Sequence, residues 1–340
     1  MFLRPARAGV ITPRLQTSPA NSHHRQAVLW LLVANLFWGL SFPLIKALVF
    51  AHQQVLPDSS TWFITACTVA PRFLIATVFL ALVLWKKLGT FTRGEIKQGA
   101  LLGLTAGGGM LFQNDGLQFT SASVSAFLTQ LYAVMIPLYL ALRLRRWPSG
   151  PVVLCCGLVL AGVAVLGRFD FQAMRLGRGE IETLISSGFF MMQILVLGRA
   201  DGAANRALPV TLVMFATEAV IFSLLAGGTA DRAADLLVPW TSGPWLALTG
   251  LLTVFCTLGS FILMNRWQPK ITTTEAGLIY CIEPVFASVM ALFLPAMFSA
   301  WAGFAYANER LTWHLLAGGG LITLANVLIQ LNPPPPRSLS

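Results

Sequence analysis

The sequence predicts an all-α, polytopic membrane protein, and three observations carry this prediction. Of the 340 residues, 56% are hydrophobic and only 11% are charged, whereas about 25% are charged in soluble globular proteins. The mean hydropathy is +0.71. The apolar residues also run continuously in long stretches rather than alternating over about 10 residues, as they do in outer-membrane barrels. Together these features exclude a soluble enzyme, a disordered chain and a disulfide scaffold.

Ten apolar stretches are expected to form membrane-spanning helices, because a bilayer core needs about 20 apolar residues per helix. A basic tail at 1–27 precedes them and a Pro-rich tail at 332–340 follows. The first stretch continues past a signal-peptide length without a small-residue cleavage site, so we expect it to be retained as the first span. In order, the ten stretches are 28–50, 62–85, 98–114, 119–141, 150–167, 181–198, 209–228, 244–264, 273–298 and 313–331.

The distribution of basic residues predicts the orientation. With the N-terminus inside, the cytoplasmic tails and loops hold sixteen Lys and Arg residues and the outer loops hold five. Cytoplasmic loops carry such an excess, so both termini are expected to be cytoplasmic, in a plasma membrane (bacterial inner membrane). The loop 168–180 is the exception, with three arginines on the outer side. The net charge of +10 is therefore ascribed to membrane topology, and no nucleic-acid partner is expected.

Two segments suggest an internal repeat. With an offset of 151 residues, SVSAFLTQLYAVMIPL (123–138) aligns with TEAGLIYCIEPVFASV (274–289), which puts Thr129 on Tyr280 and Tyr132 on Glu283. This offset covers five helices, an odd number, so the two copies would be inverted relative to each other. Inverted repeats with a binding site near the bilayer midplane are typical of secondary transporters.

Four further stretches carry a family resemblance: WGLSFPLIK (38–46), PRFLIATVFL (71–80), GLQFTSASVSAFLTQL (116–131), and TTTEAGLIYCIEPVFASVMALFL (272–294) followed by NERLTWHLLAGGGLI (308–322). In this order they resemble the drug/metabolite transporter superfamily, and within it the EamA-type transporters. The resemblance implies ten helices in two inverted five-helix repeats, 28–167 and 181–331, joined by the loop 168–180. It also implies export of small organic metabolites by alternating access.

The sequence departs from the family pattern in two places. Arg143–Arg146 stand where these proteins often have Gly-Glu. An apolar, aromatic insert at 295–308 separates the ninth and tenth spans, and we expect it at the outer membrane surface or over the outer mouth of a cavity. The resemblance favours amino acids or related amphipathic compounds as substrates. A phosphate-bearing or nucleotide-sugar type antiporter of the same superfamily and a non-transporting membrane protein are the alternatives.

Ionisable residues inside spans need a specific explanation, because hydrocarbon tolerates charge poorly. Glu283 lies mid-span beside Pro284, which removes a backbone hydrogen bond, and is predicted to bind a substrate ammonium group or to carry a proton; the alternative is a structural carboxyl. Lys46 is a candidate for ion coupling or for an anionic counter-charge, unless its stem extends to the interface. Arg72 and Glu218 are interpreted as structural intramembrane charges.

A polar stripe on the fourth span predicts a cavity wall. Ser121, Ser125, Thr129 and Tyr132 are spaced 4, 4 and 3 residues apart, which keeps them within about 80° on a helix. The alternative is helix packing, which small hydroxyl residues also serve. With residues of other spans added, the predicted substrate-binding set is Trp38, Gln113, Ser125, Thr129, Tyr132, Gln193, Tyr280 and Glu283.

Enzyme signatures are missing from the sequence. It contains no HExxH, Gly-x-Ser-x-Gly or Walker A motif, so metalloprotease, acyl-transfer and ATP-driven activities are not predicted. The four histidines form no ligand pattern, and no metal or cofactor is expected. The five cysteines lie in apolar stretches, and the glycine runs 107–109 and 318–320 are interpreted as helix-packing sites. The expected partners are a small-molecule substrate and the lipid bilayer, with the chain a monomer or homodimer.

Overall fold

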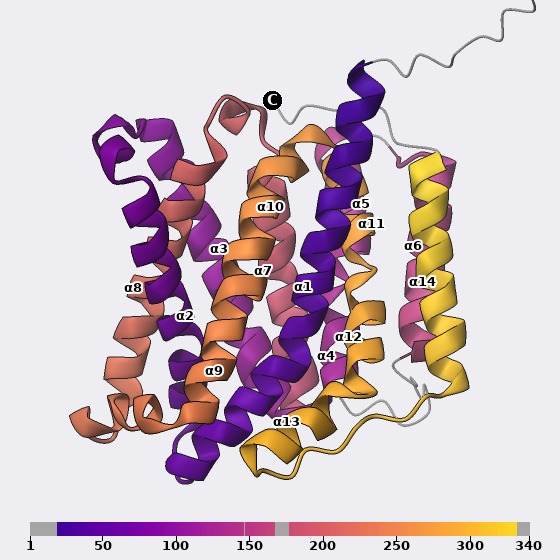
Figure 1. The fold of residues 1–340 in the computed structure, drawn as a ribbon. Coiled ribbons are helices and arrows are strands. Elements are labelled where there is room, and N and C mark those ends of the chain that lie inside the picture. Colours follow the sequence, from indigo (N-terminus) through magenta and orange to yellow (C-terminus); the bar gives the residue numbers. More distant parts are fainter. Residues whose placement is uncertain (1–18, 146, 167–176, 332–340) are drawn as a thin grey trace, which may run out of the picture.

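The computed structural model describes residues 19–145, 147–166 and 177–331. These residues form a bundle of helices, and no strand occurs among them (Figure 1). Within the described residues, seven helical stretches are long and apolar enough to cross a membrane, and two shorter apolar helices occupy Gly150–Gly162 and Leu316–Ile329. The all-α, polytopic membrane class predicted from composition is therefore confirmed.

The helices follow one another with short connections. In chain order they are α1 (Pro19–Val55), α2 (Thr61–Val83), α3 (Arg93–Phe119), α4 (Ala122–Thr129), α5 (Tyr132–Leu144), α6 (Gly150–Leu166), α7 (Arg178–Leu197), α8 (Ala207–Thr229), α9 (Gly243–Leu251), a π-helical segment (Leu252–Gly259), α10 (Ser260–Trp267), α11 (Thr273–Tyr280), α12 (Glu283–Ala291), α13 (Leu294–Ala302) and α14 (Trp313–Leu331). Short 3₁₀ turns occupy Trp85–Thr90, Ala200–Gly202, Ala233–Leu236, Val238–Thr241 and Gln268–Lys270.

Several boundaries differ from the predicted spans. Helix α1 already begins at Pro19, inside the expected 1–27 tail, because nothing in residues 19–27 breaks a helix. Part of the insert at 295–308 is helical and forms most of α13. Residues 1–18 of the N-terminal tail, residues 332–340 and most of the loop 168–180 lie outside the described residues.

The predicted fourth and ninth spans are each broken in the middle, at matching positions. Ser121 caps α4 and Thr272 caps α11, each through its side-chain oxygen. The helices then end at Thr129 and Tyr280, and α5 and α12 restart at Tyr132 and Glu283. Each pair of positions differs by the 151 residues found in the sequence alignment. Pro284, at the first turn of α12, suits a helix start because its missing N–H has no helical partner there.

The two broken helices run in opposite directions through the bundle. Figure 1 shows α4 in the lower half and α5 in the upper half, whereas α11 is in the upper half and α12 in the lower. Accordingly, α4 packs on α12 and α5 packs on α11. Figure 1 also places the start of α1 and the end of α14 at the same, upper end of the bundle, and α13 at the opposite end.

The remaining helices pack closely through small residues. Helix α3 contacts both α7 and α8, α2 contacts α8, α6 contacts α14, and α1 contacts α9, α10 and α12. At the crossing of α1 and α12, a Cβ atom on Gly39 would lie 2.6 Å from the Cβ of Phe286. On α3, a Cβ on Gly108 or Gly109 would overlap the rings of Phe189 or Phe190. The glycine run at 107–109 thus lies at a helix contact, as expected.

Ion pairs join the helices near both ends of the bundle. At the end near α13, Arg178 of α7 pairs with Asp115 of α3 and with Glu182. At the opposite end, Arg206 pairs with Glu95 at the start of α3, with Arg206 Nε 2.6 Å from Glu95 Oε1. These contacts tie α3 to the start of α7 and to the residue just before α8.

Candidate functional site

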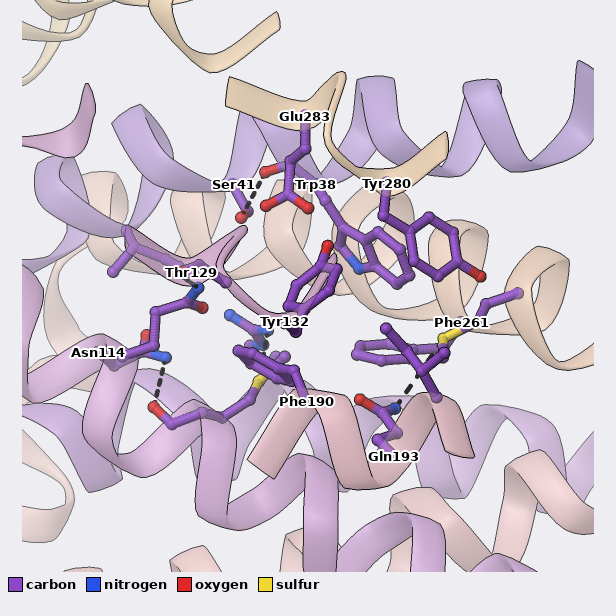
Figure 2. Close-up of a pocket in the computed structure, with 16 residues that line it drawn as sticks. Trp38, Ser41, Asn114, Thr129, Tyr132, Phe190, Gln193, Phe261, Tyr280 and Glu283 are labelled. Carbon is purple, nitrogen blue, oxygen red and sulfur yellow. Dashed lines mark hydrogen bonds between the residues drawn. The ribbon is translucent and has the colours of Figure 1, made fainter. Parts of the chain in front are cut away.

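A cavity lies inside the bundle at the level of the two helix breaks (Figure 2). The cavity volume that water can reach is about 50 Å³, enough for a few waters. Thr129 and Tyr132 border it at one break, and Tyr280 and Glu283 at the other. The full lining is Trp38, Ser41, Ile45, Arg72, Met110, Gln113, Asn114, Thr129, Tyr132, Phe190, Gln193, Ile194, Phe261, Met264, Tyr280 and Glu283.

Seven of the eight residues predicted to bind substrate line this cavity: Trp38, Gln113, Thr129, Tyr132, Gln193, Tyr280 and Glu283. The eighth, Ser125, does not. Its fully buried hydroxyl lies 3.4 Å from the Thr183 hydroxyl, between α4 and α7. Ser125 therefore occupies a helix contact, which is the packing alternative considered for the polar stripe.

Thr129 is held in a short hydrogen-bond chain. Its hydroxyl donates to the carbonyl of Ser125 over 2.8 Å and accepts from Gln113 Nε2 over 3.0 Å. The first bond is the backbone contact that a threonine commonly makes to the residue four positions earlier in a helix. The second joins α3 to α4 at the cavity wall, so the orientations of Gln113 and Thr129 depend on each other.

Tyr280 presents its ring rather than its hydroxyl to the cavity. The hydroxyl donates to Gln268 Oε1 over 2.8 Å, and Gln268 Nε2 in turn donates to the carbonyl of Ile194 over 2.9 Å. The indole of Trp38 meets the Tyr280 and Phe261 rings edge-on, with centroids 5.5 and 5.4 Å away. Such edge-to-face contacts form a rigid aromatic wall.

Among the described residues, Glu283 is the only acidic residue in the cavity lining. It is 7% exposed and begins α12, so its carboxyl group lies where the backbone leaves the helical path. In Figure 2 the Glu283 and Tyr132 side chains, one from each broken helix, point toward one another. A carboxyl group at this depth is costly unless a cavity, a partner or a proton compensates it.

The other three predicted intramembrane charges lie in different surroundings. Lys46 does not line the cavity; its ammonium group donates to the carbonyl of Thr120 over 2.9 Å. Glu218 is fully buried on α8, also outside the lining. Arg72, interpreted from the sequence as structural, does line the cavity. The sequence could not separate these cases, because a mid-span position does not reveal which face of the helix meets the cavity.

The lining also includes residues that the sequence did not single out: Ser41, Ile45, Met110, Asn114, Phe190, Ile194, Phe261 and Met264. Helical spacing was an available signal for two of them. Ser41 follows Trp38 by three residues and Phe190 precedes Gln193 by three, so each shares a helix face with a predicted residue. No cluster of three His, Cys, Asp or Glu side chains suited to a metal ion occurs in the described part of the chain.

Comparisons with known proteins agree with this architecture. The model of the EamA-like transporter family matches residues 25–168. A relative from Archaeoglobus fulgidus, described as an uncharacterized transporter, is 26% identical over 306 residues, covering 90% of this chain and 86% of its own length.

A solved crystal structure shares the fold, with a TM-score of 0.62 at 14% identity over 91% of this chain and 97% of the other. The family match and the transporter relative confirm the resemblance recognised in the sequence. These findings support a multi-pass membrane transporter that is similar to the EamA-like family over residues 25–168.

Proposed function

We propose that this EamA-like protein is a secondary transporter that exports small organic metabolites, amino acids or related amphipathic compounds, by alternating access. The observation that carries the proposal is the cavity between two broken helices, because secondary transporters bind their substrates near the midplane at discontinuous helices. The cavity combines amide and hydroxyl groups with aromatic rings and one carboxyl group. This combination suits a solute with a polar head and an apolar body.

The packing supports two inverted five-helix repeats. If α1 corresponds to α7 and α3 to α9–α10, the contact of α3 with α7 has its counterpart in the contact of α9–α10 with α1. The pairs α2 with α8 and α6 with α14 then lie on the symmetry axis, each helix contacting its own counterpart. In this arrangement the repeats can rock about the cavity, which exposes it to each side in turn.

The residues around the cavity receive separate roles in the proposal. Glu283 binds an ammonium group of the solute or carries a coupling proton. Gln113 and Thr129 supply a hydrogen-bonding edge, and Tyr132 faces Glu283 from the other repeat. Trp38, together with Tyr280, packs against the apolar part of the solute. Gln193 adds an amide on α7. Lys46, bonded to Thr120 outside the lining, has no coupling role in this scheme.

The orientation proposed is that of a plasma-membrane protein with both ends in the cytoplasm. The excess of Lys and Arg in one set of loops supports it, and so does the position of the start of α1 and the end of α14 at one end of the bundle (Figure 1). In this orientation α13 lies at the outer surface, as expected for the insert.

A phosphate-bearing substrate is less well supported. Exchangers of such solutes need paired cations, and among the described residues Arg72 is the only Lys or Arg in the cavity lining. Lys46, the second cation of that hypothesis, is bonded to a backbone carbonyl elsewhere.

An export screen tests the proposal. Cells that overproduce the protein are loaded with a panel of amino acids and related amines, and release into the medium is compared with release from cells that overproduce the Glu283→Gln variant. We expect faster release, and greater resistance to toxic analogues, for at least one amphipathic compound. Identical release from overproducing and empty-vector cells across the panel would contradict transport of this class.

A further inference from the structure

Arg72 is the one basic side chain that reaches the cavity among the described residues, and it is almost completely buried. It lies on α2 with 1% of its surface exposed. Its Nη2 lies 3.3 Å from Met110 Sδ, a weak acceptor, and its guanidinium carbon lies 5.2 Å from the centre of the Phe73 ring. Its Nε and Nη1 have no hydrogen-bond partner within the described part of the chain.

This environment does not fit an arginine that braces the fold. A bracing arginine donates to backbone carbonyls or to a carboxylate, because a buried charge without partners is strongly destabilising. Glu218 on α8 interacts with Arg72 electrostatically. However, no ion pair joins the two among the described residues, and both Glu218 carboxyl oxygens lack a hydrogen-bond partner there. Arg72 therefore lines the cavity with a guanidinium group whose Nε and Nη1 are buried without a hydrogen-bond partner among the described residues.

We propose that Arg72 binds a carboxylate group of the transported solute. A planar guanidinium presents two parallel N–H groups that match the two oxygens of a carboxylate. The cavity then has a carboxylate-binding residue from α2 and the Glu283 carboxyl group from α12, and it recognises the solute by its charge pattern as well as by its apolar body. This inference rests on the proposed transport function, because it assigns a group of the solute to one wall of the same cavity.

The test uses two probes with the same phenyl group, L-phenylalanine and phenethylamine, which differ only in the carboxylate. Binding to purified protein in detergent is measured for the wild type, Arg72→Gln, Arg72→Lys and Ser125→Ala. A hydrogen-bonded charge contributes about 1.5–3 kcal/mol, so the wild type should bind L-phenylalanine about 10- to 100-fold more tightly than phenethylamine. Arg72→Gln should bring this ratio close to one while changing phenethylamine affinity by less than about twofold.

The other variants separate recognition from structure. Arg72→Lys keeps the charge without the planar fork and should show an intermediate ratio, which decides the question if Arg72→Gln does not fold. Ser125→Ala should keep the wild-type ratio, because the Ser125 hydroxyl lies in the contact between α4 and α7 and outside the cavity lining. A wild-type ratio near one, a wild-type ratio retained in both Arg72 variants, or equal losses for both probes would overturn the inference.

Flux in proteoliposomes distinguishes this inference from the transport proposal. If L-phenylalanine binds with the expected ratios but is not moved across the membrane, the transport proposal fails and the role of Arg72 in carboxylate binding stands. If L-phenylalanine is moved but Arg72→Gln keeps the preference over phenethylamine, the inference fails and the transport proposal stands.

Discussion

Residues from distant parts of the chain form the cavity wall, and each is positioned by a local feature of its own helix. Tyr132 and Glu283 are the first residues of α5 and α12, and Thr129 and Tyr280 are the last residues of α4 and α11. A helix break thus places two side chains from each broken helix at the cavity. The hydrogen bond between Gln113 and Thr129 then connects this wall to α3.

At Glu283, we expect Glu283→Gln to abolish uptake into inside-out vesicles or to remove its dependence on a proton gradient, while the protein remains folded. The amide keeps the size of the side chain but can neither carry a proton nor balance an ammonium group. Uptake and size-exclusion profiles check this outcome. Glu218→Gln, a buried carboxyl outside the cavity, is the matched control and should keep the proton dependence. Wild-type uptake by Glu283→Gln would remove Glu283 from the mechanism.

At Thr129, we expect Thr129→Val to lower both stability and uptake. Valine has nearly the same shape but leaves Gln113 Nε2 without its acceptor, and an unsatisfied buried donor costs about 1–3 kcal/mol. Thermal unfolding in detergent and vesicle uptake measure the two effects. Ser125→Ala is the control: its hydroxyl lies in the α4–α7 contact, so it should leave uptake of the folded protein unchanged. Equal uptake by Thr129→Val and wild type would show that this edge does not touch the solute.

At the scale of elements, close helix crossings and paired helix ends hold the bundle together. Helix α1 crosses α12 where Gly39 has no side chain, and this contact brings Trp38 and Glu283 to the same cavity. At the ends, Glu95 and Arg206 join the starts of α3 and α8. These two kinds of contact respond to different perturbations, the first to side-chain volume and the second to pH.

We expect Gly39→Ala to destabilise the protein. Its new Cβ would lie 2.6 Å from Phe286 Cβ and 2.9 Å from the backbone nitrogen of Ala287, and both atoms belong to α12. Gly250→Ala on α9 is a matched control because nothing lies within 4 Å of its added Cβ, and alanine stabilises a helix interior by roughly 0.5–1 kcal/mol relative to glycine. Melting temperatures in detergent should fall for the first variant and stay level or rise for the second.

The Glu95–Arg206 pair predicts a dependence of stability on pH. Glu95 lies before the apolar part of α3, and the Arg206 guanidinium bonded to it is the main cause that lowers the pKa of Glu95 to about 2. A lowered folded-state pKa adds stability above the ordinary carboxyl pKa, and this stability is lost as the pH falls toward 2. Because Arg206 is about half exposed, solvent screens the pair, and we expect a contribution of roughly 1 kcal/mol or less.

The measurement compares wild type with Glu95→Gln at several pH values. The wild type should be the more stable protein at pH 7, and the difference should shrink between about pH 5 and pH 2. Asp201 pairs with Arg199 on the exposed surface. The control variant Asp201→Asn should therefore change stability at pH 7 by less than Glu95→Gln does. A stability difference between wild type and Glu95→Gln that stays constant over this pH range would show that the ion pair does not contribute through its charge.

At the scale of the whole molecule, the two ends of the bundle differ from each other. The start of α1 and the end of α14 lie at one end and α13 at the other (Figure 1). The two broken helices run in opposite directions between these ends. The proposed pair of inverted repeats, with an even number of crossings, would give this arrangement and would place the cavity between the two repeats.

Reporter fusions test which end of the bundle lies in the cytoplasm. A reporter that fluoresces only in the cytoplasm should be active at residue 1 and at residue 340, and a reporter active only outside should work when inserted within 303–308, after α13. If the reporter that works only outside the cell were active at one terminus and inactive at the other, the chain would cross the membrane an odd number of times. This result would contradict the proposed inverted repeat.

Some of these features depend on local sequence and were predictable from it. Long apolar stretches must enter the membrane as helices, because lipid offers no partner for backbone N–H and C=O groups. The offset of 151 residues was also visible, because the two broken helices keep similar patterns of small, polar and aliphatic residues. Polar groups are uncommon in apolar spans and seldom face lipid. For this reason seven of the residues predicted to bind substrate do line the cavity.

Only the tertiary structure decided which face of each helix meets the cavity. Ser125 and Thr129 share one stripe on α4, yet Ser125 contacts α7 and Thr129 contacts the cavity. Lys46 and Arg72 are both intramembrane cations, yet Lys46 is bonded to the carbonyl of Thr120 and Arg72 lines the cavity. These differences depend on contacts between helices that are far apart in the chain. The environment of a buried group is set by the packing of the side chains around it and not by the type of residue.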